Sequence, residues 1–558
     1  MNGGTTPSGP RVVEPAIDHV VVLALENRSF DHMLGFLSHP EPDFDGLTTG
    51  GPHTNPGWDS GTRVTAEPHA KPVLPIDPDH SHNAVMEQLA LRNDGERMRP
   101  TNQGFVTSLE RKGRGLAQPA FGGLVGPFLD WWNHRCGPAH PSLRGMGPLA
   151  LLCQPPSQVP VLSRLALEFA VCTRWFCSLP GETWPNRNFL HAATSDGEVD
   201  IVLRPYTNRT VFELLEEEGT TGHRKTWHIY HDDTPQVWAF PHLWDTADRH
   251  ANWFRLTDFA RHVATGKLPA YSFIEPNHRP PLHTLDHDPL IGTPDVSNSQ
   301  HPGNNLVSPD AYDSIVTGPD ADFARGEALI AGVYEALRSS PEVFARTVLL
   351  ITYDEHGGLY DHVPPPVGVP SPSGGSPPSW TTRLQHSLWY RKADAFDFTM
   401  LGPRVPAVIV SPFIAAGTID TQVHDHASVP ATLRALFAPH AKPLTARDDW
   451  AVPFHRVLTL AAPRTDLPDL SAYADAAFVP GAAAQGAAAA EFPSTTGEIP
   501  PYYADFMKQA DFVGHHLIAL GEPEGSWPSA TAPLHRAVQI TEAFTAAARR
   551  HREGGTDD

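Results

Sequence analysis

Six short apolar runs along the chain end abruptly in polar residues. Runs of this kind, without alternation of apolar and polar positions, are typical of strands buried on both faces, as in a parallel sheet covered by helices. They lie within residues 17–32, 167–186, 225–233, 269–278, 347–358 and 405–413. We therefore predict a central sheet that contains these six strands.

Helical patterns separate the predicted strands. Between residues 320 and 342, Ile330, Val333, Tyr334 and Leu337 recur at the i, i+3, i+4, i+7 spacing of one helix face. Because strands alternate with helices, the sequence predicts an α/β fold with a mostly parallel central sheet and helices on both faces.

The chain of 558 residues is longer than one small domain. We predict a main domain at residues 15–465, an Ala/Gly/Pro-rich linker at 466–500 and a C-terminal helical segment at 501–552.

The polar residues stand where the predicted strands end. In open α/β sheets, ligands bind beyond the carboxyl ends of the strands. Six strands that deliver acids, amides and histidines to that edge favour one shared site. The alternative is that each polar cluster only caps the turn or helix that follows it.

Composition narrows the possible partners. The chain carries 63 acidic against 41 basic side chains, a net charge of −22, and 31 histidines make this charge unusually dependent on pH. Nucleic acids and anionic membranes are bound by clustered Lys and Arg, and no basic run occurs. We therefore expect no nucleic-acid partner.

The four cysteines and the start of the chain point to a reducing compartment. Cys136, Cys153, Cys172 and Cys177 are too few and too unevenly spaced for a disulfide framework or a paired zinc site, so we expect free thiols. The sequence has no signal-peptide run, no twin arginine and no apolar stretch of transmembrane length. We expect a cytoplasmic location and no transmembrane segment.

The densest acidic motif is TYDEHGGLYDHVPPP, which begins at Thr352. Gly357 and Gly358 permit a sharp turn that lets Asp354 and Glu355 converge on one point. Two carboxylates at one point predict a site for a divalent cation. The neighbouring His356 is either a further ligand or a partner of a ligand, whereas we expect Asp361 and His362 to brace the loop.

The first predicted strand ends in Glu26 and Asn27. A carboxylate beside an amide offers one metal ligand and one neutral contact for a phosphate or a metal, whereas a structural helix cap needs only the Asn. We expect structural roles for Asp31 and His32, which follow inside a helix.

A hydroxyl stands at a helix start in SLPGETWPNRNFLHAATSDG, residues 178–197. Pro180 and Gly181 break the preceding strand, so Thr183 meets the backbone N–H groups and the positive end of a helix dipole, which favour a phosphate. A threonine needs a metal to stabilise its alkoxide, and Glu26 and the acid pair at 354–355 would hold that metal. Thr183 is either this nucleophile or an ordinary helix cap, and Ser178 is the other candidate nucleophile.

Loop histidines complete the candidate site. His80, His278 and His301 stand in DPDHSH, EPNH and SNSQHPGNN. Imidazoles suit a phosphoryl group because its oxygens are charged and its leaving group needs a proton. His82 is a weaker candidate, and the Asp425–His426 pair at a helix start favours a structural role.

Together the motifs resemble the bacterial phosphoesterase family that includes phospholipases C and an acid phosphatase, with the plant non-specific phospholipases C as relatives. The resemblance covers about residues 15–460 and rests on ENRSFDHMLGFL, DPDHSH, SLPGETWPNRNFLHAATSDG, YSFIEPNH, SQHPG, TYDEHGGLYDHVPPP, LGPRVPAVIVSPF and HDHASV, in that order.

The resemblance implies an alkaline-phosphatase-like α/β fold and hydrolysis of a phosphate ester through a phosphorylated threonine. It implies that one or more divalent ions bind Glu26, Asp354, Glu355 and Thr183, and that Asn27 contacts the phosphate. Ligation by oxygen alone suits Ca, Mg or Mn and does not identify the ion. His80, His278 and His301 would bind the phosphoryl oxygens or protonate the leaving alcohol. Many members carry a twin-arginine signal that this sequence lacks.

These expectations converge on a metal-dependent phosphoric ester hydrolase most like a phospholipase C. One alternative is an acid-phosphatase-type phosphomonoesterase that acts on a small intracellular metabolite. An alternative of another class is a non-catalytic metal-binding interaction protein that retains the fold.

Overall fold

A computed structural model describes residues 15–72, 74–96, 98–116, 144–218, 226–278, 297–303, 322–373, 396–474, 501–519 and 533–554. The larger part of the predicted linker, from residue 475 onward, lies outside these residues, as does Cys136. The cysteines that the structure describes are buried free thiols.

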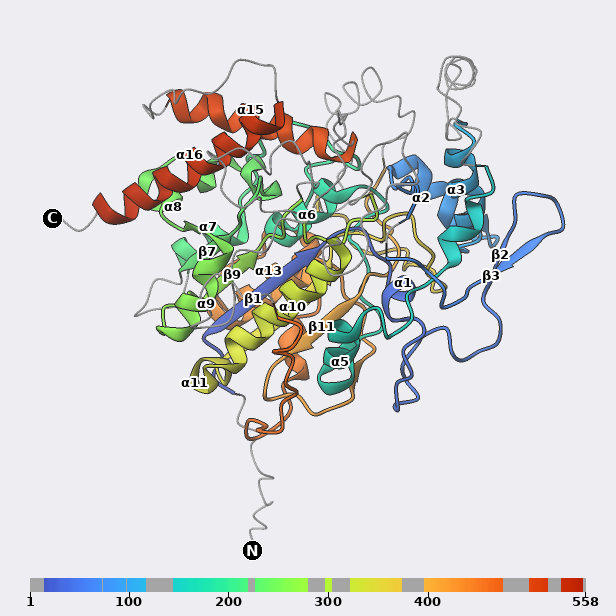
Figure 1. Ribbon diagram of the computed structural model, residues 1–558, viewed down its shortest axis with the longest axis horizontal. Helices are drawn as coiled ribbons and strands as arrows, with labels where there is room; N and C mark the ends of the chain where they lie inside the picture. Colours follow the sequence, from blue (N-terminus) through green and yellow to red (C-terminus); the bar gives the residue numbers. More distant parts are fainter. Residues whose placement is uncertain are drawn as a thin grey trace, which may run out of the picture.

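At the centre of the protein, the described residues form an eight-stranded sheet that includes all six predicted strands. In spatial order it comprises β12 (Thr418–Asp420), β6 (Ala170–Cys172), β11 (Ala407–Val410), β10 (Thr347–Tyr353), β1 (His19–Leu25), β9 (Tyr271–Ile274), β7 (Trp227–Tyr230) and β8 (Trp253–Phe254) (Figure 1). Every neighbouring pair outside β11 is parallel. The predicted α/β class and mostly parallel sheet are therefore confirmed.

One strand runs against the others. β11 is antiparallel to both β10 and β6, with Ala407 beside Thr352 near the end of β10. The amino end of β11 therefore lies at the edge where β1 and β10 end, which brings Arg404 to that edge and sends Ser411 to the opposite one. The expectation that all six strands deliver their carboxyl ends to one edge is wrong for this strand.

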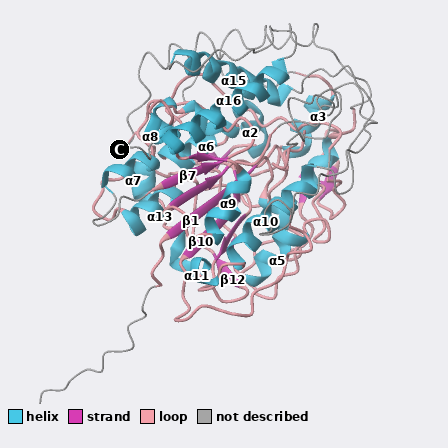
Figure 2. Cartoon of the chain, turned by 60° about the vertical axis from the view of Figure 1, so that its left-hand side comes forward, coloured by secondary structure: helices cyan, strands magenta, loops and turns pink. Residues whose placement is uncertain are grey.

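Helices cover both faces of the sheet, which stands between them in Figure 2. One face carries α5 (Pro160–Glu168), α9 (Leu256–Ala264) and α10 (Asp322–Arg338), with the short α11 (Pro341–Phe344). The other carries α6 (Thr183–Ala192), α7 (Val211–Glu218) and α13 (Ser428–Phe437). Covering helices explain why β1 and β10 are apolar without alternation: Val20 to Leu25 are completely buried, and each large aliphatic side chain contributes about 1.5–3 kcal/mol.

Smaller elements gather at one end of the molecule. They are α1 (Phe30–Leu34), α2 (His82–Leu89), α3 (Phe105–Gly113) and the hairpins β2–β3 (Thr54–Pro56, Arg63–Thr65) and β4–β5 (Arg92–Asn93, Met98–Arg99). α8 (Ala247–His250) lies beside the C-terminal helices, and α14 (Ala446–Trp450) follows α13.

The predicted C-terminal helices exist as α15 (Pro501–Ala519) and α16 (Pro533–Gly554). They pack on each other, and α16 packs on α8 and β8. His250 Nε2 lies 3.0 Å from the carbonyl oxygen of Phe544, whose ring centroid is 5.2 Å from that of Trp253. Among the described helices, none combines the length and the apolar character needed to span a membrane.

A buried carboxyl connects α10 to the start of α5. Glu327 accepts hydrogen bonds from the backbone N–H groups of Val161 (2.7 Å) and Leu162 (3.3 Å). Burial nevertheless dominates and raises the pKa of Glu327 to about 7. Burial therefore keeps this group neutral up to a higher pH than an exposed glutamate.

We predict that Glu327→Gln removes one source of pH-dependent stability. Because the folded-state pKa of Glu327 is raised to about 7, its favourable contribution is complete below about pH 4.5 and is lost as the pH rises through 7. Relative to the variant, the wild type should lose about 3 kcal/mol between pH 4.5 and 8, a change of a few degrees in Tm. Calorimetry across this range measures it, with the exposed Glu342→Gln as control; a constant Tm difference contradicts the prediction.

Candidate active site

The ends of three adjacent strands carry the central acidic residues. Glu26 and Asn27 follow β1, Asp354 and Glu355 follow β10, and Glu275 follows β9. The parallel register of these strands places the ends side by side. Asp354 Oδ1 accepts hydrogen bonds from the backbone N–H groups of Asn27 (3.0 Å) and Glu355 (2.7 Å). The structure thus brings the predicted acids to one edge.

The two glycines after the acid pair form the expected sharp turn. Gly357 and Gly358 have φ of 65° and 67°. A Cβ at position 357 would overlap the carbonyl oxygen of Asn27, and one at 358 would lie 2.9 Å from the carbonyl oxygen of Asp79. Positive φ and close backbone approach both require glycine here.

A continuous chain of alternating charges runs beneath the site. His278 Nδ1 lies 2.8 Å from Glu26 Oε2, and His278 Nε2 lies 3.0 Å from Glu275 Oε1. Arg187 Nη1 lies 2.8 Å from the same Glu275 oxygen, and Arg187 Nε lies 2.9 Å from Asp354 Oδ2. All five side chains are at most 2% exposed. Each charged side chain is therefore stabilised by the neighbouring charges in this series of ion pairs and not by water.

The contacts in this chain shift the pKa values of its members. Burial alone would raise the pKa of Glu26, but His278 outweighs it and holds that pKa well below its usual range. Burial would lower the pKa of His278, but Glu26 and Glu275 raise it to about 10. Burial raises the pKa of Asp354 to about 7, with Glu26 and Glu355 adding to it and Arg187 opposing it. Glu26 and His278 therefore both favour their charged forms, whereas burial weakens the preference of Asp354 for its charged form.

Thr183 is the first residue of α6, and its hydroxyl is not a helix cap. The cap position is Glu182. Thr183 Oγ1 instead donates to Asn27 Oδ1 over 3.3 Å, and Asn27 Nδ2 lies 3.3 Å from His80 Nε2. Asn27 has a φ of 56°, a conformation that asparagine tolerates better than most residues. Asn27 thus connects the hydroxyl at the start of α6 to an imidazole of another loop.

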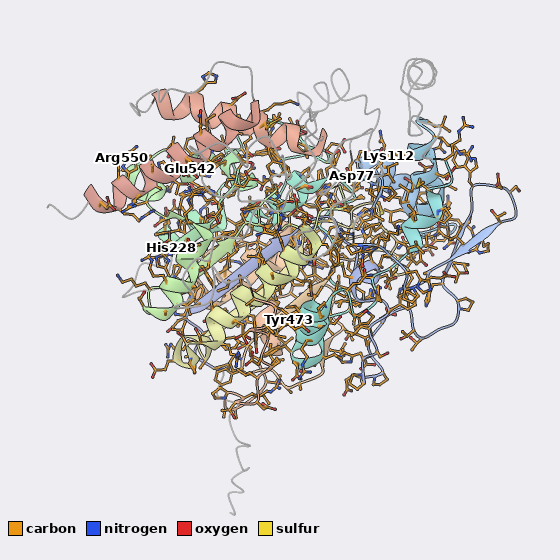
Figure 3. All side chains as sticks on the ribbon, in the orientation of Figure 1. Asp77, Lys112, His228, Tyr473, Glu542 and Arg550 are labelled. Atoms are coloured by element: carbon orange, nitrogen blue, oxygen red, sulfur yellow. The ribbon has the colours of Figure 1, made fainter. Side chains whose placement is uncertain are left out.

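A cavity of about 430 Å³ opens in front of Thr183. Its wall consists of Glu26, Asp77, Asp79, His80, Ser81, Lys112, Glu182, Thr183, Asp200, Ile201, His301, Asp505 and Phe506. Figure 3 labels Asp77 and Lys112, which lie at the end of the molecule that carries α2 and α3. The cavity brings residues of at least four distant segments together around the hydroxyl.

Two of the three predicted histidines line this cavity. The ring centroids of His80 and His301 are 5.9 Å apart. Burial would lower the pKa of His80, but Glu355, Asp77 and Glu182 raise it to about 9. Burial lowers the pKa of His301, and its Nδ1 accepts from the Gly303 N–H over 3.0 Å, so the neutral ring carries its proton on Nε2.

His278 occupies a different environment. Both of its ring nitrogens face carboxylates, and its ring stacks on Phe506 of α15 at a centroid distance of 4.4 Å and an angle of 14°. The contacts of His278 therefore favour a role in holding Glu26 over direct contact with a ligand.

Ser178 is fully buried in a bonded network away from the cavity wall. Its hydroxyl donates to Asp425 Oδ2 over 2.9 Å and accepts from the His426 N–H over 3.1 Å. Arg447 Nη1 also lies 2.9 Å from Asp425 Oδ2, and His426 Nε2 lies 2.6 Å from the Asp354 carbonyl oxygen. These contacts favour the structural reading of Asp425 and His426 and disfavour Ser178 as a nucleophile.

The residues expected to brace the acidic loop do so through a buried arginine. Arg404 Nε lies 2.8 Å from Asp361 Oδ1, and Arg404 Nη2 lies 2.9 Å from Asp31 Oδ1. His362 Nδ1 lies 2.7 Å from Asp31 Oδ2. His356 lies between Glu355 and Gln88, with its Nδ1 3.2 Å from Glu355 Oε2 and its Nε2 2.7 Å from Gln88 Oε1. These contacts favour its reading as the partner of a ligand.

Nearby polar groups also make structural contacts. His32 Nε2 lies 3.0 Å from Arg28 Nη1, as expected for a structural residue, and His82 Nδ1 lies 2.5 Å from the Pro180 carbonyl oxygen.

The predicted ligand set suits a hard divalent cation by its chemistry. Glu26, Asp354, Glu355 and Thr183 all offer oxygen, and Glu355 Oε1 is buried without a hydrogen-bond partner. Within the described residues, the groups of three ligand atoms that lie within 4.8 Å of one another are Cys172/Asp420/His424 and Asp31/Asp361/His362. In this structure Asp354 is held by Arg187 and the Asn27 N–H, and Glu26 is held by His278.

Sequence reasoning missed several residues of this site. Arg187 stands within the motif at residues 178–197, but the sequence does not reveal that it is the counter-charge of Glu275 and Asp354. Phe506 and Lys112 reach the cavity from segments without a chemical motif, so the sequence offers little signal for them. Asp77 belongs to the DPDHSH motif, in which the sequence points to the histidines and not to this acid.

The sequence is similar to a family of phosphoesterases and to several phospholipases C. A model of the Phosphoesterase family matches residues 17–438. Non-specific phospholipase C3 of Arabidopsis thaliana is 33% identical over 483 residues, which cover 83% of this chain and 77% of the relative. Non-specific phospholipase C6 of Arabidopsis thaliana is 34% identical, over 81% of this chain and 74% of the relative. Phospholipase C B of Mycobacterium tuberculosis is 27% identical, over 78% and 76%.

Solved structures match much more weakly. The phosphonate monoester hydrolase of Agrobacterium radiobacter has a TM-score of 0.24 and 12% identity over 50% of this chain and 68% of its own. A score this low supports no conclusion.

We predict that Arg187→Met is strongly destabilising. It leaves Asp354 and Glu275 buried without their shared counter-charge, which costs roughly 3–5 kcal/mol. Arg549→Met, which removes a pair between side chains 74% and 64% exposed, should change stability by less than about 1 kcal/mol. Thermal unfolding of both variants measures the difference, and equal Tm values contradict the central role of Arg187.

Proposed function

The chain belongs to the Phosphoesterase family and is a phosphoric ester hydrolase, and from this premise we propose a metal-dependent phospholipase C that acts through a phosphothreonine on Thr183. The observation that carries the proposal is the position of the Thr183 hydroxyl. It stands at the first residue of α6, in the wall of the cavity, and is bonded to Asn27.

The start of α6 suits an incoming phosphate. The first N–H groups of a helix have no partner within the helix, and the helix dipole favours negative charge at this end. In the wall of the same cavity, His301 would offer its Nε2–H to a phosphoryl oxygen, and His80, whose pKa is raised to about 9, would add a positive charge. The hydrogen bond from Thr183 to Asn27 fixes the direction of the hydroxyl.

Glu26, Asp354 and Glu355, together with the Thr183 oxygen, would hold the metal. Their oxygen chemistry and the unpartnered Glu355 Oε1 support this assignment. A bound divalent cation would supply positive charge that stabilises the threonine alkoxide and the charged phosphoryl group.

The proposed reaction proceeds in two displacements. Thr183 Oγ1 bonds to phosphorus while the bond from phosphorus to the glycerol oxygen breaks. The proton that Thr183 loses is balanced by the one that the alcohol gains, and the imidazole of His80 or His301 carries it. A water molecule then attacks phosphorus, releases the phosphorylated head group and restores the hydroxyl.

We predict that Thr183→Ala lowers turnover at least about a thousandfold, as expected when a nucleophile is removed. The wild type, quenched with acid during turnover, should carry phosphate on the peptide that contains Thr183. Ser178→Ala is the matched control and should retain most activity per folded molecule, because Ser178 is bound to Asp425. Retained turnover of Thr183→Ala refutes the assignment.

Metal removal should abolish the activity. We expect dialysis against a chelator to stop hydrolysis of a chromogenic phosphate ester, and add-back of Ca²⁺, Mg²⁺ or Mn²⁺ to restore it. Asp354→Asn should resist rescue at the same concentrations. Activity that survives chelation contradicts metal dependence, and inactivity with every cation and ester favours a metal-binding interaction protein.

A comparison of substrates separates the two enzymatic alternatives. A phospholipase C releases phosphocholine from phosphatidylcholine, whereas a phosphomonoesterase releases phosphate from a small monoester. We predict the larger kcat/KM for the phospholipid, measured side by side in mixed micelles. A larger kcat/KM for the monoester favours a phosphatase that acts on an intracellular metabolite. The cytoplasmic location remains a separate prediction.

A further inference from the structure

Gln300, the residue before His301, adopts a backbone conformation that few side chains accept. Its φ is 68°, and it is fully buried. A residue other than Gly is strained in this region and persists there only where the surrounding structure holds it. His301 follows directly and lines the cavity.

Contacts on every side hold Gln300 in place. The Tyr353 hydroxyl, at the end of β10, donates to Gln300 Oε1, and Gln300 Nε2 donates to the Phe323 carbonyl over 3.0 Å. Arg28 Nε donates to the Gln300 carbonyl oxygen over 2.7 Å. The peptide that leads into His301 is therefore fixed by β10, α10 and the segment after β1.

Helix α10 leaves room for this side chain. A Cβ at Gly326 would overlap Gln300 Cγ and lie 2.8 Å from its Cδ. These inner atoms cannot move away cheaply, because both polar atoms at the end of the side chain are bonded. Glycine inside a helix is less favourable than alanine, so the space needed by Gln300 accounts for glycine at position 326.

We propose that Gln300 is a positioning residue that aims His301 at the phosphoryl group, with Gly326 providing the space that allows it. The inference rests on the proposed function, since His301 acts on the ester only there. The strained backbone at Gln300 sets where the His301 side chain enters the wall of the cavity that Thr183 also lines. Gly326 in α10 thereby affects the rate of the reaction without contacting the reacting groups.

The test is a set of variants assayed with a chromogenic aryl phosphodiester. We expect Gln300→Ala and Gly326→Ala each to lower kcat/KM about 10–100-fold, as displacement by about 1 Å costs in other enzymes. Tyr353→Phe, which removes one hydrogen bond without changing the core, should give a smaller loss. Tm and circular dichroism establish that each variant is folded.

Double variants show whether the effect passes through His301. Gln300→Ala should add no further loss to His301→Ala, because the group that it aims is already gone. Gly326→Ala should add nothing to Gln300→Ala, because alanine at position 300 leaves no Cγ to overlap.

Three results overturn the proposal. These are wild-type kcat/KM in Gln300→Ala and Gly326→Ala, additive losses in the double variant with His301→Ala, and full activity of His301→Ala. The proposed function is judged separately by Thr183→Ala, which should be inactive whether or not Gln300 positions His301.

Discussion

Burial of acidic side chains at the carboxyl edge of the sheet is the constraint on which the site depends. Carboxylates removed from water need a counter-charge at short range. Glu26, His278, Glu275, Arg187 and Asp354 satisfy this need as one chain in which negative and positive groups alternate. Three strands and one helix must therefore keep their relative positions for any of these charges to be tolerated.

Buried ion pairs also hold the loops around the site. Arg28, Arg187, Arg404 and Arg447 are among the largest fully buried side chains, and each joins segments far apart in the sequence. Arg404 joins α1 to the acidic loop through Asp31 and Asp361. A planar guanidinium group can donate hydrogen bonds to several oxygens at once. One buried arginine can therefore hold a loop that has few backbone hydrogen bonds of its own.

The C-terminal helices are part of this arrangement. Phe506 of α15 stacks on His278 and lines the cavity, while Asp505 beside it adds to the acidic wall. α15 therefore stabilises the histidine that faces Glu26. A segment without any catalytic motif thus contributes to the environment of the reacting groups.

The sequence by itself determined the α/β class, the six strands and the α10 helix, because these follow from local periodicity. It also indicated that Glu26, Thr183 and Asp354 lie close together, because polar residues follow the strand ends. It could not reveal that β11 runs antiparallel, that Ser178 is bound to Asp425, or that His278 lies between two carboxylates. Those facts depend on which distant segments meet, and local patterns carry no information about partners hundreds of residues away. Tertiary structure alone decided which histidines face the cavity and which one holds an acid.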